Sequence, residues 1–318
     1  MQIFACPTCG AQVWFHNLDC RCGAQLGFDV ARQRMTPADA PCKHRATLGC
    51  NWHGVAGPGE EVGACLSCAM TRTHPDLAVP GNAAFWAETE AAKRWVLDGL
   101  VRWGWFTAED AGPRPVFDLL AETTSGGAHP VTMGHADGVI TINVTEASPA
   151  IRAERQARLG ESYRTMIGHM RHELAHFLFW RLSREAGFTD GFRALFGDEG
   201  ADYGAALASY YDSPPAPDPG HVTPYAQAHP HEDWAETVAH LLHLADLTDS
   251  GAAAGFLPAQ DAYRETGTDA LIGQAVDLAI GMNHVNRALG HPDVYPFVLT
   301  APVREKLRFA HRWLRRSG

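Results

Sequence analysis

The 318-residue sequence has no cysteine after Cys68, although eight cysteines lie up to that point. It has no uncharged apolar run of about 18 residues, so we expect no helix that spans a membrane. The first seven residues lack the basic segment and apolar stretch of a secretory signal, which favours a cytoplasmic protein. In that setting, closely spaced cysteines indicate metal ligands rather than disulfides.

The sequence also has fewer basic than acidic residues: it contains 26 Lys and Arg and 36 Asp and Glu, which gives a formal net charge of −10. An acidic surface repels phosphate backbones, so a nucleic-acid partner is disfavoured. The hydrophobic content of 46% and the charged content of 19% are those of a globular protein. The chain is long enough to form more than one unit.

Cysteine, glycine and proline are frequent in residues 1–75, a segment too small to hold a core without a stabilising metal. Cys6-Pro-Thr-Cys9 is followed by Gly10, which allows the left-handed turn of a zinc knuckle. The pair Cys20-Arg-Cys22 has a shorter spacer. A redox dithiol is the alternative, and the second pair argues against it. We therefore predict a first structural zinc site formed by Cys6, Cys9, Cys20 and Cys22.

The remaining cysteines end in Cys65-Leu-Ser-Cys68, which again has knuckle spacing. His44 and His53 are close enough in the sequence to replace one of the cysteines as ligands. Buried free thiols are the alternative interpretation. We predict that residues 1–75 form a zinc-ribbon module whose second structural zinc site consists of Cys42, Cys50, Cys65 and Cys68.

Long helical periods begin near residue 82. The predicted strands cover 116–121 and 138–144, and a proline-rich loop covers 212–220. The sequence therefore predicts an α+β fold, mostly helical with a small sheet, over residues 82–318. The predicted helices cover 84–103, 150–185, 200–211, 232–247, 269–289 and 302–316.

The segment His172-Glu173-Leu-Ala-His176 lies in the longest predicted helix. Apolar residues such as Met170 and Leu174 form one stripe of this helix, and the two histidines fall on the opposite side. Spacing of four residues lets both imidazoles bind one ion, while Glu173 reaches a water from the flank. The pattern has only three fixed letters, so it needs support from its context.

A second helix start offers that support, because Pro230 precedes a run of acidic residues. Zincins of the gluzincin type take a third ligand from a glutamate on a later helix, which assigns Glu232 to the metal. Glu236 would then orient His172 or His176 through a hydrogen bond. A solvated acidic helix start is the alternative interpretation.

The sequence also resembles a bacterial family of zinc-binding metallopeptidases with an amino-terminal zinc ribbon, and the resemblance covers nearly the whole chain. It departs from the family pattern at His231, where an aromatic residue is expected, and in the loop 212–220. The motifs that carry the resemblance are Cys50-Asn-Trp52, Cys65-Leu-Ser-Cys68, Gly134–Asn143, Gly168–His176, Phe196–Glu199, Ala228–Glu236, Asn286–Gly290 and Tyr295-Pro-Phe297.

The resemblance implies a zincin-like metallopeptidase with one catalytic and two structural zinc ions, acting on a peptide or protein substrate. A zinc-activated water would attack the peptide bond, with Glu173 as general base. Tyr225 and His229 are candidates for stabilising the oxyanion, and His135 is a weaker one. Residues 139–144 would form a strand at the rim of the cleft and pair with the substrate.

Two alternatives to a peptidase stay open. The same metal site could serve an isopeptidase or an amidase. The protein could instead be a non-catalytic module that binds a protein partner through its zinc ribbon. Glu173 distinguishes the second alternative, because a structural zinc site has no need of a carboxylate at that position.

Overall fold

The computed structural model describes residues 2–54, 63–159 and 165–316. The chain divides into two compact units, Gln2–Phe177 and Leu178–Gly318. The boundary falls inside one continuous helix, α5 (Met166–Leu182), which contributes residues to both units. The zinc ribbon therefore belongs to the same compact unit as the residues that follow it up to Phe177.

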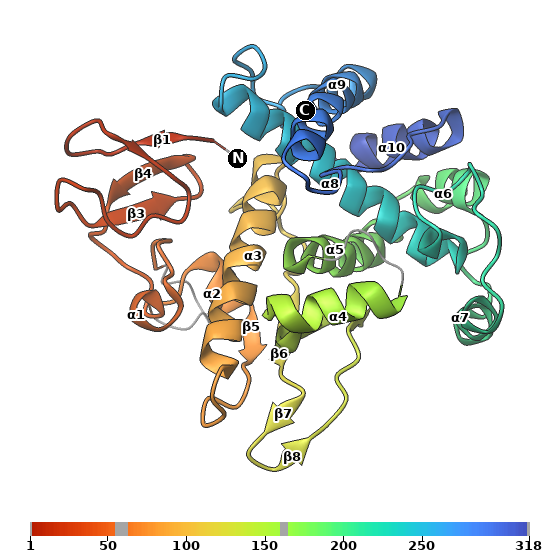
Figure 1. Cartoon of the computed structure of the whole chain (residues 1–318), viewed down its shortest axis with the longest axis horizontal. Coiled ribbons are helices and arrows are strands. Elements are labelled where there is room, and N and C mark those ends of the chain that lie inside the picture. Colours follow the sequence, from red (N-terminus) through yellow and green to blue (C-terminus); the bar gives the residue numbers. More distant parts are fainter. Residues whose placement is uncertain (1, 55–62, 160–164, 317–318) are drawn as a thin grey trace. The chain divides into compact units, whose positions relative to one another are not determined.

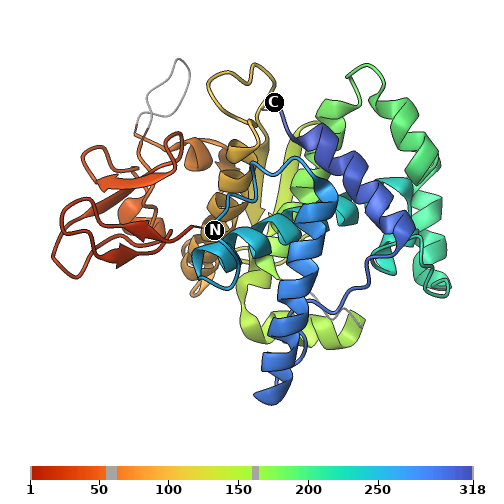
Figure 2. The ribbon, with the colours of Figure 1, turned by 90° about the horizontal axis from the view of Figure 1, so that it is seen from above.

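Short antiparallel hairpins build the start of the first unit (Figure 2). Phe28 is fully buried among aromatic rings, with centroid distances of 5.3 Å to Phe4 and 4.9 Å to Phe15. This small aromatic cluster cannot hold the segment alone, which agrees with the need for a metal. The elements are β1 (Phe4–Ala5), β2 (Gln12–Val13), β3 (Leu26–Asp29), β4 (Arg34–Pro37), α1 (Arg45–Leu48) and α2 (Leu66–Ala69).

A four-stranded sheet forms the centre of the first unit, in the order β5-β6-β10-β9. Its first three strands are parallel, and β9 runs antiparallel to β10. The two predicted strands are confirmed as β6 and β10. The hairpin turn between β9 and β10 places Asp137 and Gly138 at positive φ. The bounds are β5 (Thr71–Thr73), β6 (Val116–Leu120), β9 (Gly134–Ala136) and β10 (Val139–Asn143).

The sheet order corrects one expectation. Strand β10 was predicted to lie at an open rim, yet it is paired with β6 on one side and with β9 on the other over Val139–Thr141. The residues of β10 alternate around buried Ile140 and Ile142, so its side chains serve the core. The antiparallel edge strand of the sheet is β9.

Strand β5 ends just before the expected module boundary near residue 75, but it pairs with a strand beyond that boundary. Thr71 of β5 pairs with Phe117 of β6, so the last strand of the ribbon segment is part of the sheet. Helix α3 (Asn82–Arg102) follows directly, in agreement with the predicted helix 84–103. It lies beside α1 and α2 of the ribbon (Figure 1).

The helix predicted over 150–185 is two helices in the structure, α4 (Pro149–Leu159) and α5. The sequence between them contains Gly160, a poor helix former that lies outside the described residues. The other elements of the first unit are β7 (Thr123–Thr124), β8 (Gly127–Ala128) and the 3₁₀ helix η1 (Val144–Ala147).

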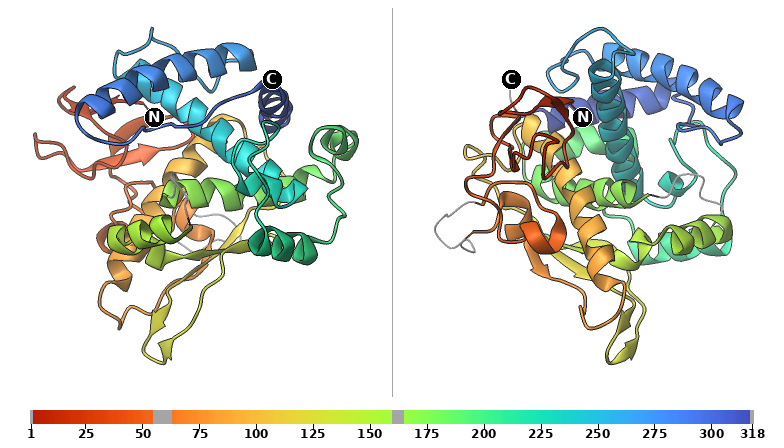
Figure 3. Two further views of the ribbon diagram at one scale, coloured as in Figure 1. Left: turned by 45° about the vertical axis from the view of Figure 1, so that its right-hand side comes forward. Right: turned by 60° about the vertical axis from the view of Figure 1, so that its left-hand side comes forward.

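The second unit is helical in its described part, and its longest helix, α8, packs against α6, α9 and α10 (Figure 3). Trp234 of α8 is fully buried, with its ring 5.3 Å from Phe188 and 6.2 Å from Phe309. The helices are α6 (Phe188–Phe196), α7 (Tyr203–Asp212), α8 (Pro230–Ala253), α9 (Thr268–Ala288), α10 (Ala301–Leu314) and the 3₁₀ helix η2 (Tyr225–Gln227).

Helix α6 was not predicted, although its phenylalanines at 188, 192 and 196 have helical spacing and are all buried. The predicted loop 212–220 contains no helix or strand after Asp212. Among the described residues, no helix is long and apolar enough to cross a membrane. The α+β fold with a small sheet and a Cys-rich amino-terminal module is confirmed.

Candidate metal centres

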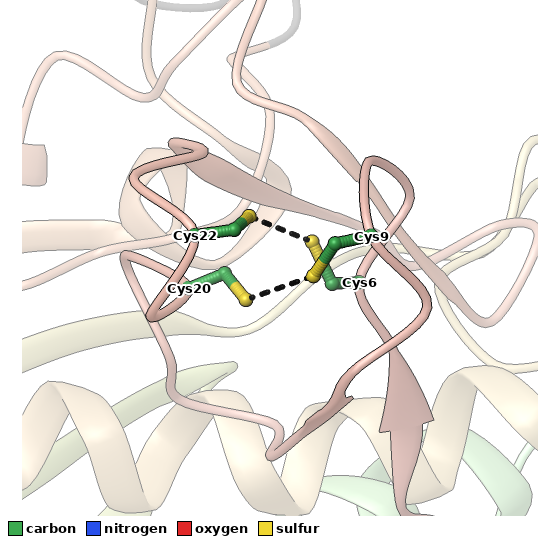
Figure 4. Close-up of side chains that lie close together, drawn as sticks. All are labelled: Cys6, Cys9, Cys20 and Cys22. Carbon is green, nitrogen blue, oxygen red and sulfur yellow. Dashed lines mark hydrogen bonds between the residues drawn. The ribbon is translucent and has the colours of Figure 1, made fainter.

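The first predicted cysteine site is assembled in the ribbon, and its four sulfur atoms lie within 4.8 Å of one another. The Sγ atoms are 3.8 Å apart for Cys6 and Cys22 and 3.7 Å apart for Cys9 and Cys20 (Figure 4). Tetrahedral zinc with Zn–S bonds of ~2.3 Å requires S···S distances of about 3.8 Å, so the geometry fits zinc. Disulfides need about 2.05 Å and are ruled out for these pairs.

Glycines shape both turns of this site. Gly10 donates its N–H to the carbonyl of Cys6 at 2.9 Å and has φ +72°. Gly23 does the same toward Cys20 at 2.8 Å with φ +87°. Both residues lie in the left-handed region that a side chain disfavours, which explains glycine after each cysteine pair.

The second cysteine site is also assembled, and all four of its cysteines are buried. The Sγ atom of Cys50 lies 3.6 Å from that of Cys65 and 3.9 Å from that of Cys68. Backbone N–H groups point at the sulfurs: Cys65 N donates to Cys42 Sγ, and Cys68 N donates to Cys65 Sγ, each at 3.4 Å. Such donors stabilise thiolates, so this set also fits zinc.

The alternative histidine ligands lie elsewhere. His53 Nε2 is 2.5 Å from Thr36 Oγ1, and the ring of His44 packs against Trp86 with a centroid distance of 5.8 Å. Neither histidine belongs to a ligand group in the described part of the chain. The second site is therefore a four-cysteine site.

Helix α5 positions the predicted histidine pair. The Nε2 atoms of His172 and His176 are 3.2 Å apart, and their rings are nearly perpendicular, at 78°. Zinc ligated by two imidazoles at ~2.0–2.1 Å requires an N···N distance of about 3.3 Å. The apolar stripe is confirmed by the burial of Met170 and Leu174, which anchors the helix and leaves both imidazoles partly exposed.

Glu173 lies next to this pair in the same helix and is only 7% exposed. Its Oε2 atom is buried and has no hydrogen-bond partner among the described residues. A buried carboxylate oxygen without a donor is costly unless a ligand or water occupies the space beside it. The arrangement provides a proton acceptor beside a metal site.

In the second unit, the start of α8 carries the predicted acidic residues. Glu232 is 1% exposed, and its Oε1 accepts a hydrogen bond from the hydroxyl of Tyr203 at 2.7 Å. Burial, followed by the negative charge of Glu232, raises the pKa of Tyr225, which keeps this phenol protonated. Glu236 accepts a hydrogen bond from Thr223 Oγ1 at 2.8 Å.

His229, one of the oxyanion candidates, caps α8. Its Nδ1 accepts from the N–H of His231 at 3.1 Å, which places the proton on Nε2 for donation to the carbonyl of Ala201, also at 3.1 Å. Both ring nitrogens are thus engaged in the cap. Tyr203 was missed because its distance from Glu232 in the sequence carries no signal of contact.

His172, His176 and Glu232 form the third group of candidate ligands among the described residues. Two imidazoles and one carboxylate are the ligand set of catalytic zinc sites that keep a fourth position open. Zinc therefore fits three groups of side chains by their chemistry.

The family described as "Putative zinc-binding metallo-peptidase" matches residues 82–313, and a zinc-ribbon domain matches residues 3–79. Proteins of Mycobacterium tuberculosis and Mycobacterium bovis, described only as uncharacterized, are 36% identical over 326 residues, covering 98% of this chain and 94% of theirs. No solved structure matches the chain. The chain belongs to this family of zinc-binding metallopeptidases, with a zinc-ribbon domain at its amino-terminal end.

Proposed function

We propose that the protein is a zinc-dependent peptidase with its catalytic centre on α5. One observation carries the proposal: the Nε2 atoms of His172 and His176 are 3.2 Å apart, and buried Oε2 of neighbouring Glu173 has no hydrogen-bond partner in the described residues.

His172, His176 and Glu232 would hold the metal. When bound there, zinc lowers the pKa of a water ligand to ~7 and polarises the carbonyl of the substrate. The hydroxyl of Tyr203 would hold the carboxylate of Glu232 in one orientation through its hydrogen bond. A carboxylate that is already oriented loses less conformational entropy when it binds the metal.

Glu173 would act as the general base and then as the general acid. Its Oε2 accepts a proton from the attacking water as the water oxygen bonds to the carbonyl carbon. The carbon–nitrogen bond then breaks, and Glu173 gives the proton to the leaving amine nitrogen. Tyr225, whose raised pKa keeps its hydroxyl protonated, is the candidate donor to the oxyanion.

The substrate would pair with strand β9 rather than with β10. Strand β9 is one of the two edge strands of the sheet, and its His135 ring packs against Phe177 of α5 with a centroid distance of 5.9 Å. Phe177 directly follows His176, so a peptide added to β9 would run close to the metal helix. An extended peptide recognised in this way keeps its backbone fixed while side chains at alternate positions vary.

Glu173→Gln tests the proposal, because an amide cannot accept the proton from water. We expect cleavage of a proteome-derived peptide library, read by mass spectrometry, to fall by about 10²–10⁴-fold while zinc content and circular dichroism stay unchanged. Glu154→Gln, at an exposed position of α4, is the matched control and should keep full activity.

Each rival function predicts a different result. Cleavage of lysine ε-amide isopeptides without cleavage of ordinary peptides would assign an isopeptidase to the same metal site. No cleavage by the zinc-loaded wild-type protein on either substrate class would refute hydrolysis and favour a binding module.

A further inference from the structure

Helix α7 differs from the other helices of the second unit, because none of its ten residues is buried. Helices α6, α8, α9 and α10 each bury three or more side chains. Helix α7 lies at the periphery of its unit (Figure 1), and yet three of its residues are tyrosines. Because it contributes so little burial to the fold, a role in binding is the better explanation of these aromatic side chains.

The tyrosines of α7 begin at Glu232, the proposed metal ligand, and extend away from it. The hydroxyl of Tyr203 donates a hydrogen bond to Glu232 Oε1 at 2.7 Å. Tyr210 follows seven residues later, on nearly the same face of the helix and roughly 10 Å along its axis. The ring of Tyr210 lies 5.8 Å from that of Tyr225 in η2 and 5.6 Å from that of Tyr211. These four tyrosines are named the tyrosine row.

The tyrosine row is open to solvent. Tyr203 is 46% exposed and Tyr211 is 64% exposed, while Tyr210 and Tyr225 are partly exposed. Tyrosine is enriched in binding surfaces because its ring offers a large apolar area and its hydroxyl offers a hydrogen bond at a low cost in conformational entropy. The exposed ring faces can therefore be reached by a ligand.

The surroundings of the tyrosine row are acidic. No lysine or arginine occurs from residue 194 to residue 263. The basic side chains that meet this stretch are already paired: Arg193 with Glu199, and Lys306 of α10 with Asp233, each at 2.5 Å. The exposed acidic residues of the stretch therefore leave an excess of negative charge, which attracts cations and repels acidic peptides.

The carboxyl end of α7 concentrates this negative charge. Asp212 is the last residue of the helix, is exposed and directly follows Tyr211. The end of a helix carries a partial negative charge that favours a basic residue in the last turn, and α7 has none there. An acidic residue at this position is unfavourable for the helix itself, and local conflicts of this kind are expected at functional sites. A cation bound beside Asp212 would resolve the conflict.

We propose that the tyrosine row and Asp212 form a subsite for a basic side chain, lysine or arginine, of the peptide substrate. The inference rests on the proposed peptidase function and adds the class of substrate. A cation over the face of a tyrosine ring is attracted by the ring quadrupole, and the carboxylate adds a charge–charge attraction. Because the row begins at Glu232, the basic residue would lie within about three positions of the bond that is cleaved.

Binding of matched peptides tests the subsite without any need for turnover. The probes are fluorescein-labelled octapeptides of alanine and serine with a single lysine at each position in turn, and the same set with norleucine, which is apolar and of similar length. Fluorescence anisotropy is measured with the zinc-loaded full-length protein carrying Glu173→Gln. We expect one lysine position to bind about 5–20-fold more tightly than its norleucine counterpart. The difference should shrink as salt is added.

Substitutions at two exposed positions separate the ring from the charge. Tyr211→Leu keeps apolar bulk but removes the ring face, so we expect the preference for lysine over norleucine to fall about 2–5-fold. Asp212→Asn should lower it by a similar factor, and Tyr211→Trp should raise it because tryptophan binds cations best. Phe256→Leu and Asp277→Asn, both exposed and in the same unit, are the matched controls and should leave the preference unchanged.

The outcomes separate the subsite from the chemistry. An unchanged preference in both Tyr211→Leu and Asp212→Asn would overturn the proposal. Norleucine peptides that bind as tightly as lysine peptides would show an apolar subsite, and a dimer in sedimentation that Tyr211→Leu abolishes would show a second copy of the chain on this face; either result also overturns it. Lysine-selective binding that both variants weaken, together with no cleavage by the wild-type protein, would refute the peptidase and support the site for basic side chains.

Discussion

Cys9 and Cys22 of the first cysteine site are exposed, whereas all four cysteines of the second site are buried. Both sites use four thiolates at distances that fit zinc. The first is shaped by two glycine turns over residues 6–23, whereas helix α2 of the second, which contains Cys68 and is capped by Cys65, packs against α3. Four cysteines can therefore form either an exposed zinc site that stabilises only nearby turns or a zinc site that is part of the buried core.

The largest expected difference between the two sites follows from Cys65→Ser and Cys22→Ser. Zinc contributes about 10–16 kcal/mol to small zinc domains, and the second site is the buried one of the two. We expect Cys65→Ser to abolish cooperative unfolding of the first unit, measured by circular dichroism during urea titration. Cys22→Ser should unfold only the hairpins around the first site. Equal losses in the two variants would contradict the comparison.

A chain that begins at residue 78 tests the same dependence from the other side. It lacks β5, which pairs with β6, and it exposes the aromatic and charged face of α3 that the ribbon covers. We expect it to be insoluble, with solubility recovered on coexpression with residues 1–77. A soluble truncated protein with native sedimentation would show that the ribbon is a separable module, as its sequence boundary at residue 75 predicted.

The proposed catalytic site should respond to its carboxylates in a graded way. Glu232→Gln removes a charged ligand and should weaken zinc binding by more than the ~10–100-fold typical of a supporting residue. Glu236→Gln removes only the acceptor of the Thr223 hydroxyl or a partner of a ligand histidine, so we expect a smaller effect. Chelator competition on both variants measures the difference, and the reverse order would exchange the two roles.

The smallest expected effect concerns pH. Burial lowers the pKa of His311 in α10 to about 4, so the folded state holds it neutral while the unfolded state protonates it near pH 6.5. Stability is therefore fully present above pH 6.5 and is lost as pH falls toward 4. From pH 7 to pH 5 we expect His311 to account for about 2 kcal/mol. Urea unfolding of His311→Gln should show a correspondingly flatter pH dependence, and exposed His291→Gln should not.

Short-range sequence patterns were sufficient to predict both cysteine sites and most of the helices. Cysteine spacing predicted both zinc sites, and the period of α5 placed Met170 and Leu174 in the core with the two histidines on another side. Most helix bounds agree within a few residues because apolar periodicity, proline and glycine act over one or two turns. The missed helix α6 had the same signal in its three phenylalanines.

The amino-acid sequence by itself determined the ligand types, their spacing and the helix that carries His172, Glu173 and His176, because these depend on neighbours within about four residues. Only the tertiary structure decided that β10 is internal and that β9 is an edge strand, since strand order depends on contacts distant in sequence. It also decided that the hydroxyl of Tyr203 donates a hydrogen bond to Glu232 and that Arg94 is buried. Burial of a charge is a property of the folded chain, and no local spacing encodes it.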